Sequence, residues 1–270
     1  MIDSPWIIIL KRNSSQIVYP HQCGIIMVKT GGEILSLFVI ADLHLSLGTD
    51  KPMDIFFGWD DYVEKLKNNW QKLVSPEDTV VIPGDISWGM SLEDSLTDFK
   101  FLNELNGKKI IMKGNHDYWW NTKTKMEEFF KNNNLDTLCI LNNNHFAYEN
   151  IGICGSRGWF NETGDDADKK VLLREAGRLE MSIKSALSEG LDPVVFLHYP
   201  PIFGYGINEE LMDVLYRYKI KHCFYGHIHG KGSVNAINGE KNGIIFRLIS
   251  SDYLQFVPLN INDVVQYYKK

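Results

Sequence analysis

The chain is poor in cysteine, and its few cysteines do not form metal or redox motifs. The 270 residues contain four of them, Cys23, Cys139, Cys154 and Cys223, and no two have the CxxC spacing of zinc-thiolate or thioredoxin-like sites. Cys154 and Cys223 lie inside apolar runs, which predicts buried free thiols. This cysteine usage fits a reducing cytosol.

Long apolar runs are also absent. No segment approaches the ~20 apolar residues of a membrane-spanning helix. The N-terminal stretch has Asp3 where a signal peptide carries basic residues, and its apolar run covers only Trp6 to Leu10. We therefore expect a cytoplasmic protein that does not enter a membrane.

The sequence has no excess of basic residues. It has 28 Lys and Arg against 34 Asp and Glu, giving a formal net charge of -6. Such a chain has no general attraction to nucleic acid or to anionic membranes. Hydrophobic residues make up 44% of the sequence, which is enough for one sizeable core. We find no internal repeat that would indicate a repeat protein.

Residues 1–34 differ from the rest of the chain. They lack clear periodicity, and the first convincing strand begins at Leu35. Gly31-Gly32-Glu33 can be the translation of a purine-rich ribosome-binding sequence, after which Leu35 would be read from a TTG start codon. We hypothesise that 1–34 is a non-native or disordered extension before a single domain spanning 35–270. A true N-terminal arm from Met1, or a start at Met27, is the alternative.

Short β-branched runs alternate with helical patterns over most of this domain. Buried strands are predicted at 35–41, 79–83, 109–113, 150–155, 193–198 and 221–226, and helices at 60–74, 91–105, 172–187 and 209–218. Residues 243–259 read as strands without intervening helices. This order predicts an α/β layered domain with a mixed sheet or two packed sheets.

Potential metal ligands follow five of the predicted strands. The strand ends carry Asp42-Leu43-His44, Gly84-Asp85, Gly114-Asn115-His116-Asp117, His198-Tyr199-Pro200-Pro201 and Gly226-His227-Ile228-His229. Ligands of open α/β sheets bind at the carboxyl ends of strands, so all five clusters can meet along one edge. Taken singly, each cluster is more often a turn, a helix cap or a core histidine than a metal site. Five such clusters at five strand ends are not readily explained by chance.

The types of side chain indicate which metals would bind. In extended chain, residues i and i+2 point to the same side, so Asp42 and His44 are expected to reach one metal together. Carboxylate, amide and imidazole donors without thiolate suit Mn²⁺, Fe or Zn²⁺ better than a structural zinc site. Mn²⁺ is our first expectation.

The motifs DLH, GD, GNHD, HYPP and GHIH, in this order over residues 42–229, resemble the calcineurin-like metallophosphoesterase superfamily. KPMDIF (51–56), KGNHDYWW (113–120), YGHIHG (225–230) and SSDYL (250–254) are further similar to a group of bacterial predicted phosphohydrolases. The resemblance implies a four-layer fold of two facing mixed β-sheets flanked by helices. It names no substrate.

The same resemblance implies a dinuclear metal centre. One metal would be held by Asp42, His44, Asp85 and His229, and the other by Asp85, Asn115, His198 and His227. Asp85 would bridge metals roughly 3.5–4 Å apart. A hydroxide bridging them would attack phosphorus in line, with His116 as the general acid for the leaving group. Asp117 would orient His116 or neighbouring backbone, or would cap a helix.

The sequence departs from the superfamily's protein phosphatases. Their GDxVDRG motif is matched here by 84–90, where Trp88 and Gly89 replace the second Asp and the phosphate-binding Arg. Arg157 is a candidate replacement clamp; stacking on Trp159 or pairing with an acid is the alternative. Trp88, Trp119, Trp120 and Trp159 are candidates for stacking on a flat leaving group, or for core packing.

The sequence therefore predicts a hydrolase acting on a small-molecule phosphoester, either a monoester or a diester. A nuclease of the same superfamily is the alternative, which the acidic charge balance disfavours. A second alternative is a non-catalytic metal-binding scaffold, which the complete set of expected ligands disfavours. The oligomeric state is left open.

Overall fold

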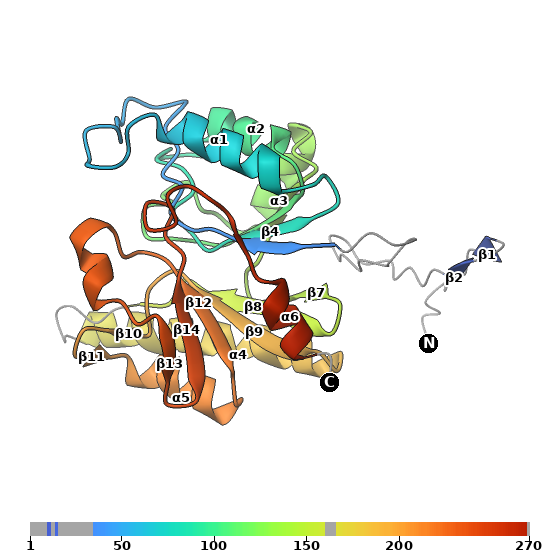
Figure 1. Ribbon diagram of the computed structural model, residues 1–270, viewed down its shortest axis with the longest axis vertical. Helices are drawn as coiled ribbons and strands as arrows, with labels where there is room; N and C mark the ends of the chain where they lie inside the picture. The colour runs from blue at the N-terminus through green and yellow to red at the C-terminus, as the bar shows by residue number, and fades with distance from the viewer. Residues whose placement is uncertain (1–9, 12–13, 16–34, 160–165, 269–270) are drawn as a thin grey trace.

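The computed structural model describes residues 10–11, 14–15, 35–159 and 166–268 (Figure 1). The predicted N-terminal extension, 1–34, lies outside them apart from a short antiparallel pair, β1 (Leu10–Lys11) and β2 (Ser14–Ser15). Cys139, Cys154 and Cys223 are buried free thiols, which confirms the prediction for the latter two. None of the described helices is long and apolar enough to cross a membrane.

Two mixed sheets form the centre of the fold. The first has the order β15-β3-β4-β5-β6, with β3 (Leu37–Val39), β4 (Thr79–Ile82), β5 (Lys108–Ile111) and β6 (Leu138–Ile140) parallel and β15 (Leu259–Asn260) antiparallel. The second has the order β13-β14-β12-β9-β8-β7. Its parallel strands are β14 (Ile244–Leu248), β12 (His222–Tyr225), β9 (Asp192–Leu197) and β8 (Ile151–Ser156); its edges, β13 (Gly239–Lys241) and β7 (Phe146–Tyr148), are antiparallel.

Helices cover the outer faces of both sheets (Figure 1). The first sheet is covered by α1 (Tyr62–Leu73), α2 (Leu96–Glu104) and α3 (Lys123–Asn132), and the second by α4 (Asp166–Ser188) and α5 (Glu209–Arg217). The short α6 (Asn262–Tyr267) packs into the core between the sheets. The remaining elements are the hairpin β10 (Ile202–Phe203) and β11 (Gly206–Ile207) and the 3₁₀ helix η1 (Gly230–Asn235). The predicted four-layer α/β fold is thus confirmed.

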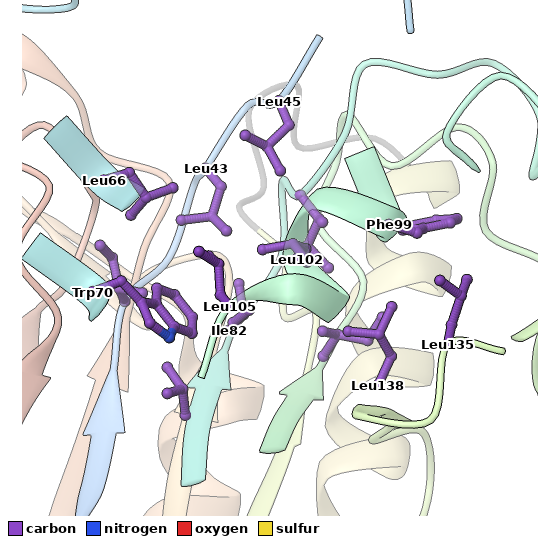
Figure 2. Close-up of a cluster of buried hydrophobic side chains, with 14 of the residues drawn as sticks. Leu43, Leu45, Leu66, Trp70, Ile82, Phe99, Leu102, Leu105, Leu135 and Leu138 are labelled. Carbon is purple, nitrogen blue, oxygen red and sulfur yellow. The ribbon is translucent and has the colours of Figure 1, made fainter. Parts of the chain in front are cut away.

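Alternation along each strand explains the layers. In β3, Leu37 and Val39 face the second sheet, whereas Phe38 and the following Ile40 face the helices. Because successive side chains point to opposite faces, a strand that is apolar throughout can be buried on both sides. Figure 2 shows the helix-facing side, where Trp70 of α1 and Leu102 of α2 pack over Ile82 of β4.

The structure corrects three details of the sequence prediction. Helix α3 was not predicted, and α2 begins at Leu96 instead of residue 91 because Ser91 and Asp94 close a separate turn. The expected strands over 243–259 are interrupted at 251–256, where Gln255 and Phe256 adopt positive φ angles of 53° and 58°. That turn brings Asp252 back to the edge that carries the five clusters.

Candidate metal centre

The five clusters converge at the carboxyl edges of the two sheets. Backbone hydrogen bonds join the loops directly: Asp42 N–H donates to Gly84 O at 3.0 Å, and His44 N–H donates to Asp85 O at 2.9 Å. His227 N–H donates to Asp42 Oδ2 at 2.8 Å, which links the first sheet to the second. The structure therefore brings together all seven side chains that the sequence singled out as metal ligands.

The reason why Asp42 and His44 share a site differs from the prediction. We expected extended chain, but Asp42 has φ 59°, His44 φ 46° and Asp85 φ 50°. Left-handed backbone costs energy for residues with a Cβ, and such strain persists where surrounding contacts impose it. Here the loops after β3 and β4 turn tightly enough for their side chains to face one point.

Two glycines permit the close approach of these loops. A Cβ on Gly114 would lie 2.1 Å from Asp85 Oδ1, and a Cβ on Gly226 would lie 2.5 Å from Asp42 Oδ2. Both distances are below any real contact, so a side chain at either position would displace a carboxylate of the site.

The first donor group consists of Asp42, His44 and His229, whose ligand atoms all lie within 4.8 Å of one another. The Nε2 atoms of His44 and His229 are 3.3 Å apart, and His229 Nε2 is 4.0 Å from Asp42 Oδ1. Asp42 is fully buried, and its Oδ1 has no hydrogen-bond partner among the described residues. An acceptor in this position is suited to a cation.

The second donor group consists of Asp85, His198 and His227, again with ligand atoms within 4.8 Å of one another. Asn115 Oδ1 lies 2.5 Å from His198 Nε2 and 2.9 Å from His227 Nδ1. Asp85 Oδ2 lies 3.5 Å from His198 Nε2 and 3.6 Å from His44 Nε2. Asp85 is therefore placed between the two groups.

The hydrogen bonds of two imidazoles fit a bound cation. His198 Nδ1–H donates to Pro83 O at 3.2 Å, and His229 Nδ1–H donates to Asp252 Oδ1 at 2.8 Å. A neutral imidazole that donates through Nδ1 presents the lone pair of Nε2. In His198 that lone pair faces the acceptor atoms of Asn115 and Asp85, an arrangement that a divalent cation stabilises.

The pKa values of most side chains in the two donor groups also fit a bound cation. Burial raises the pKa of Asp42 to about 7 and that of Asp85 to about 6, against the opposing effect of nearby histidines. Burial lowers the pKa of His198 far below its ordinary value and that of His227 to about 2. The imidazoles of His198 and His227 are thus held neutral, as metal ligands must be, and the carboxylates need positive charge to ionise fully. His229 is the exception: burial lowers its pKa, but the hydrogen bond to Asp252 and the nearby carboxylates outweigh burial and raise the pKa to about 9.

Two carboxylates that are not ligands support the site. Asp117 is fully buried and accepts the N–H of Asp85 at 2.9 Å, of Ile86 at 2.8 Å and of Gly114 at 2.7 Å. It therefore orients neighbouring backbone, one of the roles predicted for it. Asp252 was missed by sequence reasoning; its Oδ1 holds His229 and its Oδ2 accepts from Gly230 N–H at 2.8 Å.

His116 lies at the rim of the donor groups. Its N–H donates to Asp85 Oδ1 at 2.8 Å, and its ring is 5.6 Å from that of His44 between centroids. The Trp88 ring lies 4.4 Å from His116 and stacks on His44 at 5.1 Å. The exposed Lys51, a second residue that sequence reasoning missed, places Nζ 4.4 Å from the Trp88 centroid. A cation, an aromatic ring and an imidazole thus border one side of the site.

The other tryptophans lie in different surroundings. Trp119 is 1% exposed, packs against Phe99 in the core and donates to Asp117 Oδ1 at 3.1 Å, so it offers no face to a substrate. Its position corrects the proposed substrate-binding role. Trp120 packs against Trp119 and is partly exposed.

Arg157 makes both of the contacts that the sequence offered as alternatives to a phosphate clamp. Its guanidinium lies 4.7 Å from the Trp159 ring centroid and 3.8 Å from Glu175 Oε1. Both of these contacts are therefore present, and the role of Arg157 as a phosphate clamp stays a prediction.

A comparison with protein families agrees with this geometry. The calcineurin-like phosphoesterase model matches residues 35–231, most of the chain and all seven candidate ligands. The chain belongs to the calcineurin-like phosphoesterase family. Hydrolysis of phosphoester bonds is the reaction class of this family, and two donor groups suit its dinuclear metal centres.

Solved structures with a similar fold are distant in sequence. Protein AQ665 of unknown function from Aquifex aeolicus is 15% identical with a TM-score of 0.47, covering 87% of this chain and 100% of that one. Phosphopantetheinyl hydrolase from Mycobacterium tuberculosis is 14% identical with a TM-score of 0.49, covering 84% and 95%. Purple acid phosphatase PPD1 from yellow lupin is 10% identical with a TM-score of 0.44, covering 81% and 44%. At this distance none carries information about the substrate. No curated protein matches the sequence.

Proposed function

We propose that the protein hydrolyses a small-molecule phosphoester at a centre of two divalent cations, with His116 as the general acid. The observation that carries the proposal is the position of Asp85. Its Oδ2 lies 3.6 Å from His44 of the first donor group and 3.5 Å from His198 of the second. One carboxylate oxygen facing two donor groups fits a bridging ligand.

The two groups assign seven side chains to the cations. Asp42, His44 and His229 would hold one, Asn115, His198 and His227 the other, and Asp85 both. When bound, the cations would supply Lewis-acid activation of the phosphoryl group and a lowered pKa for the attacking water. Oxygen and nitrogen donors favour Mn²⁺, with Fe or Zn²⁺ as alternatives.

The chain's own residues account for the remaining steps. Asp117 fixes the backbone of Asp85 and Gly114, so that the donors keep their positions during the reaction. His116 is adjacent in sequence to Asn115 yet belongs to neither donor group, which leaves its imidazole available to protonate the leaving oxygen. Lys51 supplies positive charge on the same side.

The acidic charge balance and the missing GDxVDRG arginine favour a small molecule over nucleic acid or a phosphoprotein. Membership of the bacterial predicted-phosphohydrolase group and a cytoplasmic location remain predictions from the sequence. We also leave monoester and diester both open, because each is compatible with the donor groups.

Turnover of p-nitrophenyl phosphate and bis-p-nitrophenyl phosphate after loading with Mn²⁺ tests the proposal. We expect His116→Ala to retain two equivalents of metal by elemental analysis and to lose ~10²–10⁴-fold in kcat. The matched control is His145→Asn, because His145 bonds Ser185 and Glu189 away from the metal centre. A wild-type protein that binds fewer than two metals and hydrolyses neither ester would contradict the function. An unchanged kcat in His116→Ala would reject only the role of His116.

A further inference from the structure

The imidazole of His116 has one hydrogen-bond partner among the described residues. Its Nδ1 lies 3.4 Å from the hydroxyl oxygen of Tyr118, and the two rings meet edge to face with their centroids 6.1 Å apart. The backbone N–H of His116 is engaged separately, because it donates to Asp85 Oδ1. The orientation of the imidazole therefore depends on a side chain two residues further along the chain.

The other polar side chains beside His116 are bonded elsewhere. The Trp88 ring packs 4.4 Å from the His116 ring, but its Nε1–H donates to Met53 Sδ at 3.2 Å, and an indole offers no acceptor. Both carboxylate oxygens of Asp117 accept backbone N–H groups, and Oδ1 also accepts the indole N–H of Trp119. Neither Trp88 nor Asp117 is hydrogen-bonded to the imidazole, although Asp117 was one of the groups predicted to orient it.

The backbone around Tyr118 is held on both sides. Tyr118 N–H donates to His116 O at 2.9 Å, and Trp120 N–H donates to Asp117 O at 3.2 Å, so the chain turns tightly here. The flanking Asp117 and Trp119 are buried, whereas the Tyr118 side chain is 53% exposed. A half-exposed ring on a fixed backbone contributes little to the core, so removal of its hydroxyl should leave the fold intact.

The chemistry of a general acid gives this contact a purpose. An imidazole that donates a proton to a leaving oxygen starts as the imidazolium, in which both ring nitrogens carry a proton. If Nδ1–H donates to the Tyr118 oxygen, Nε2–H is the proton that passes to the leaving oxygen as the bond between phosphorus and oxygen breaks. The imidazole then stays neutral with its proton on Nδ1, and Tyr118 neither gains nor loses a proton.

We propose that Tyr118 is a positioning residue for the general acid: its hydroxyl accepts from His116 Nδ1–H and thereby reserves Nε2 for the leaving group. This inference rests on the proposed function and, within it, on the acid role of His116. Tyr118 acts only through His116. Its effect is largest for esters with poor leaving groups, because a more basic leaving oxygen depends more on protonation in the transition state.

The chain offers a matched pair of variants for the test. Tyr118→Phe removes the hydroxyl and keeps the ring. Tyr216→Phe is the control: Tyr216 is 45% exposed, its hydroxyl accepts from Asn242 Nδ2 at 3.0 Å, and it lies in α5 on the outer face of the second sheet. Thermal unfolding and elemental analysis show that each variant is folded and carries two equivalents of metal.

The first measurement is hydrolysis of p-nitrophenyl, phenyl and benzyl esters with Mn²⁺, as monoesters or as methyl diesters according to which the wild type hydrolyses. We expect Tyr118→Phe to lower kcat less than about threefold for the p-nitrophenyl ester and about tenfold or more for the benzyl ester, with KM unchanged. Tyr216→Phe should match the wild type on all three. No loss in Tyr118→Phe, or an equal loss for all three leaving groups, would overturn the positioning role.

The second measurement is a double-mutant cycle on the phenyl ester. A residue that acts only through His116 has nothing left to position once the imidazole is removed, so Tyr118→Phe should cause no further loss in the His116→Ala background. Additive losses would show an effect independent of His116 and overturn the proposal. A wild type without activity would refute the proposed function and this role with it, whereas an active wild type equalled by Tyr118→Phe would overturn the role of Tyr118 alone.

Discussion

Replacement of Asp252 by Asn tests whether a residue outside the ligand set controls metal binding. In the wild type, Oδ1 accepts from His229 Nδ1 and Oδ2 accepts from Gly230 N–H, both at 2.8 Å. Asn has the same shape but only one acceptor oxygen, so one of these two donors must face an NH₂ group. The imidazole of His229 then loses its orientation, its charged partner or both.

The expected magnitude follows from measurements on comparable sites. Loss of a carboxylate that holds a ligating histidine typically weakens metal affinity ~10–100-fold, or about 1.4–2.7 kcal/mol. Because Asp252 contacts only His229 among the ligands, the loss should fall on the metal of the first donor group. Asp252→Ala, which removes both acceptors, should bind more weakly still.

Calorimetric titration of metal-free protein with Mn²⁺ measures both sites. We expect two binding events in the wild type. In Asp252→Asn, one of the two events should be weakened and the other unchanged, and activity should be largely restored at saturating metal. Asp263→Asn is the control, because Asp263 pairs with Arg247 at the surface, 2.9 Å away and apart from the ligands. Unchanged affinity at both sites in Asp252→Asn would refute the positioning role. Equal weakening of both would refute its assignment to the first group.

Three further predictions concern charge and metal. Lys51→Met should lower kcat/KM for the dianion p-nitrophenyl phosphate about fivefold to tenfold, because the ammonium of Lys51 lies beside Trp88 and His116. The decrease should be smaller for the monoanionic diester bis-p-nitrophenyl phosphate. Equal effects on both esters would argue against phosphate recognition by Lys51. Burial lowers the pKa of Lys109 to about 7 from 10.5, so unfolding takes up a proton between these values and wild-type stability rises with pH there. The stability of Lys109→Met relative to wild type should therefore be greatest near pH 7 and decline by on the order of 2 kcal/mol by pH 9.5, in urea titrations of chelated protein; a constant difference would contradict the burial of a titrating amine. Chelation should lower the free energy of unfolding by about 2.7 kcal/mol for each site held at a hundred times its Kd, measured as a fall in Tm; no change in Tm would show that the groups bind no metal under those conditions.

The parts of the fold that the sequence predicted are those set by local pattern. The strands that precede the candidate ligands form at apolar β-branched runs, because a strand that is buried on both faces is apolar throughout. Their carboxyl ends meet at one edge, so the residues that follow them share a site. Asp85 and His198 could be assigned in this way without knowledge of strand order.

The supporting residues could not be found by the same route. Asp252 reaches His229 only because the chain turns at 251–256, where Gln255 and Phe256 adopt positive φ without any glycine to signal it. Lys51 lies in a loop without periodicity, and its contact with Trp88 depends on where that loop packs. The SSDYL and KPMDIF motifs drew attention to these segments, but a motif alone does not state which atom a side chain contacts.

The pairing of ligands across the two sheets has a consequence for stability. Asp42 and His44 follow β3 of the first sheet, whereas their partner His229 follows β12 of the second; likewise Asp85 follows β4, and His198 follows β9. A cation in either group would therefore be held by both sheets at once and would bind only when they are packed together. The core between the sheets is apolar along its length, so it fixes their separation without fixing their lateral register as sharply as directional bonds do. If the two donor groups bind metal as proposed, metal binding and sheet packing are thermodynamically linked: loosening the core between the sheets would weaken both sites, and each bound cation would favour the packed arrangement.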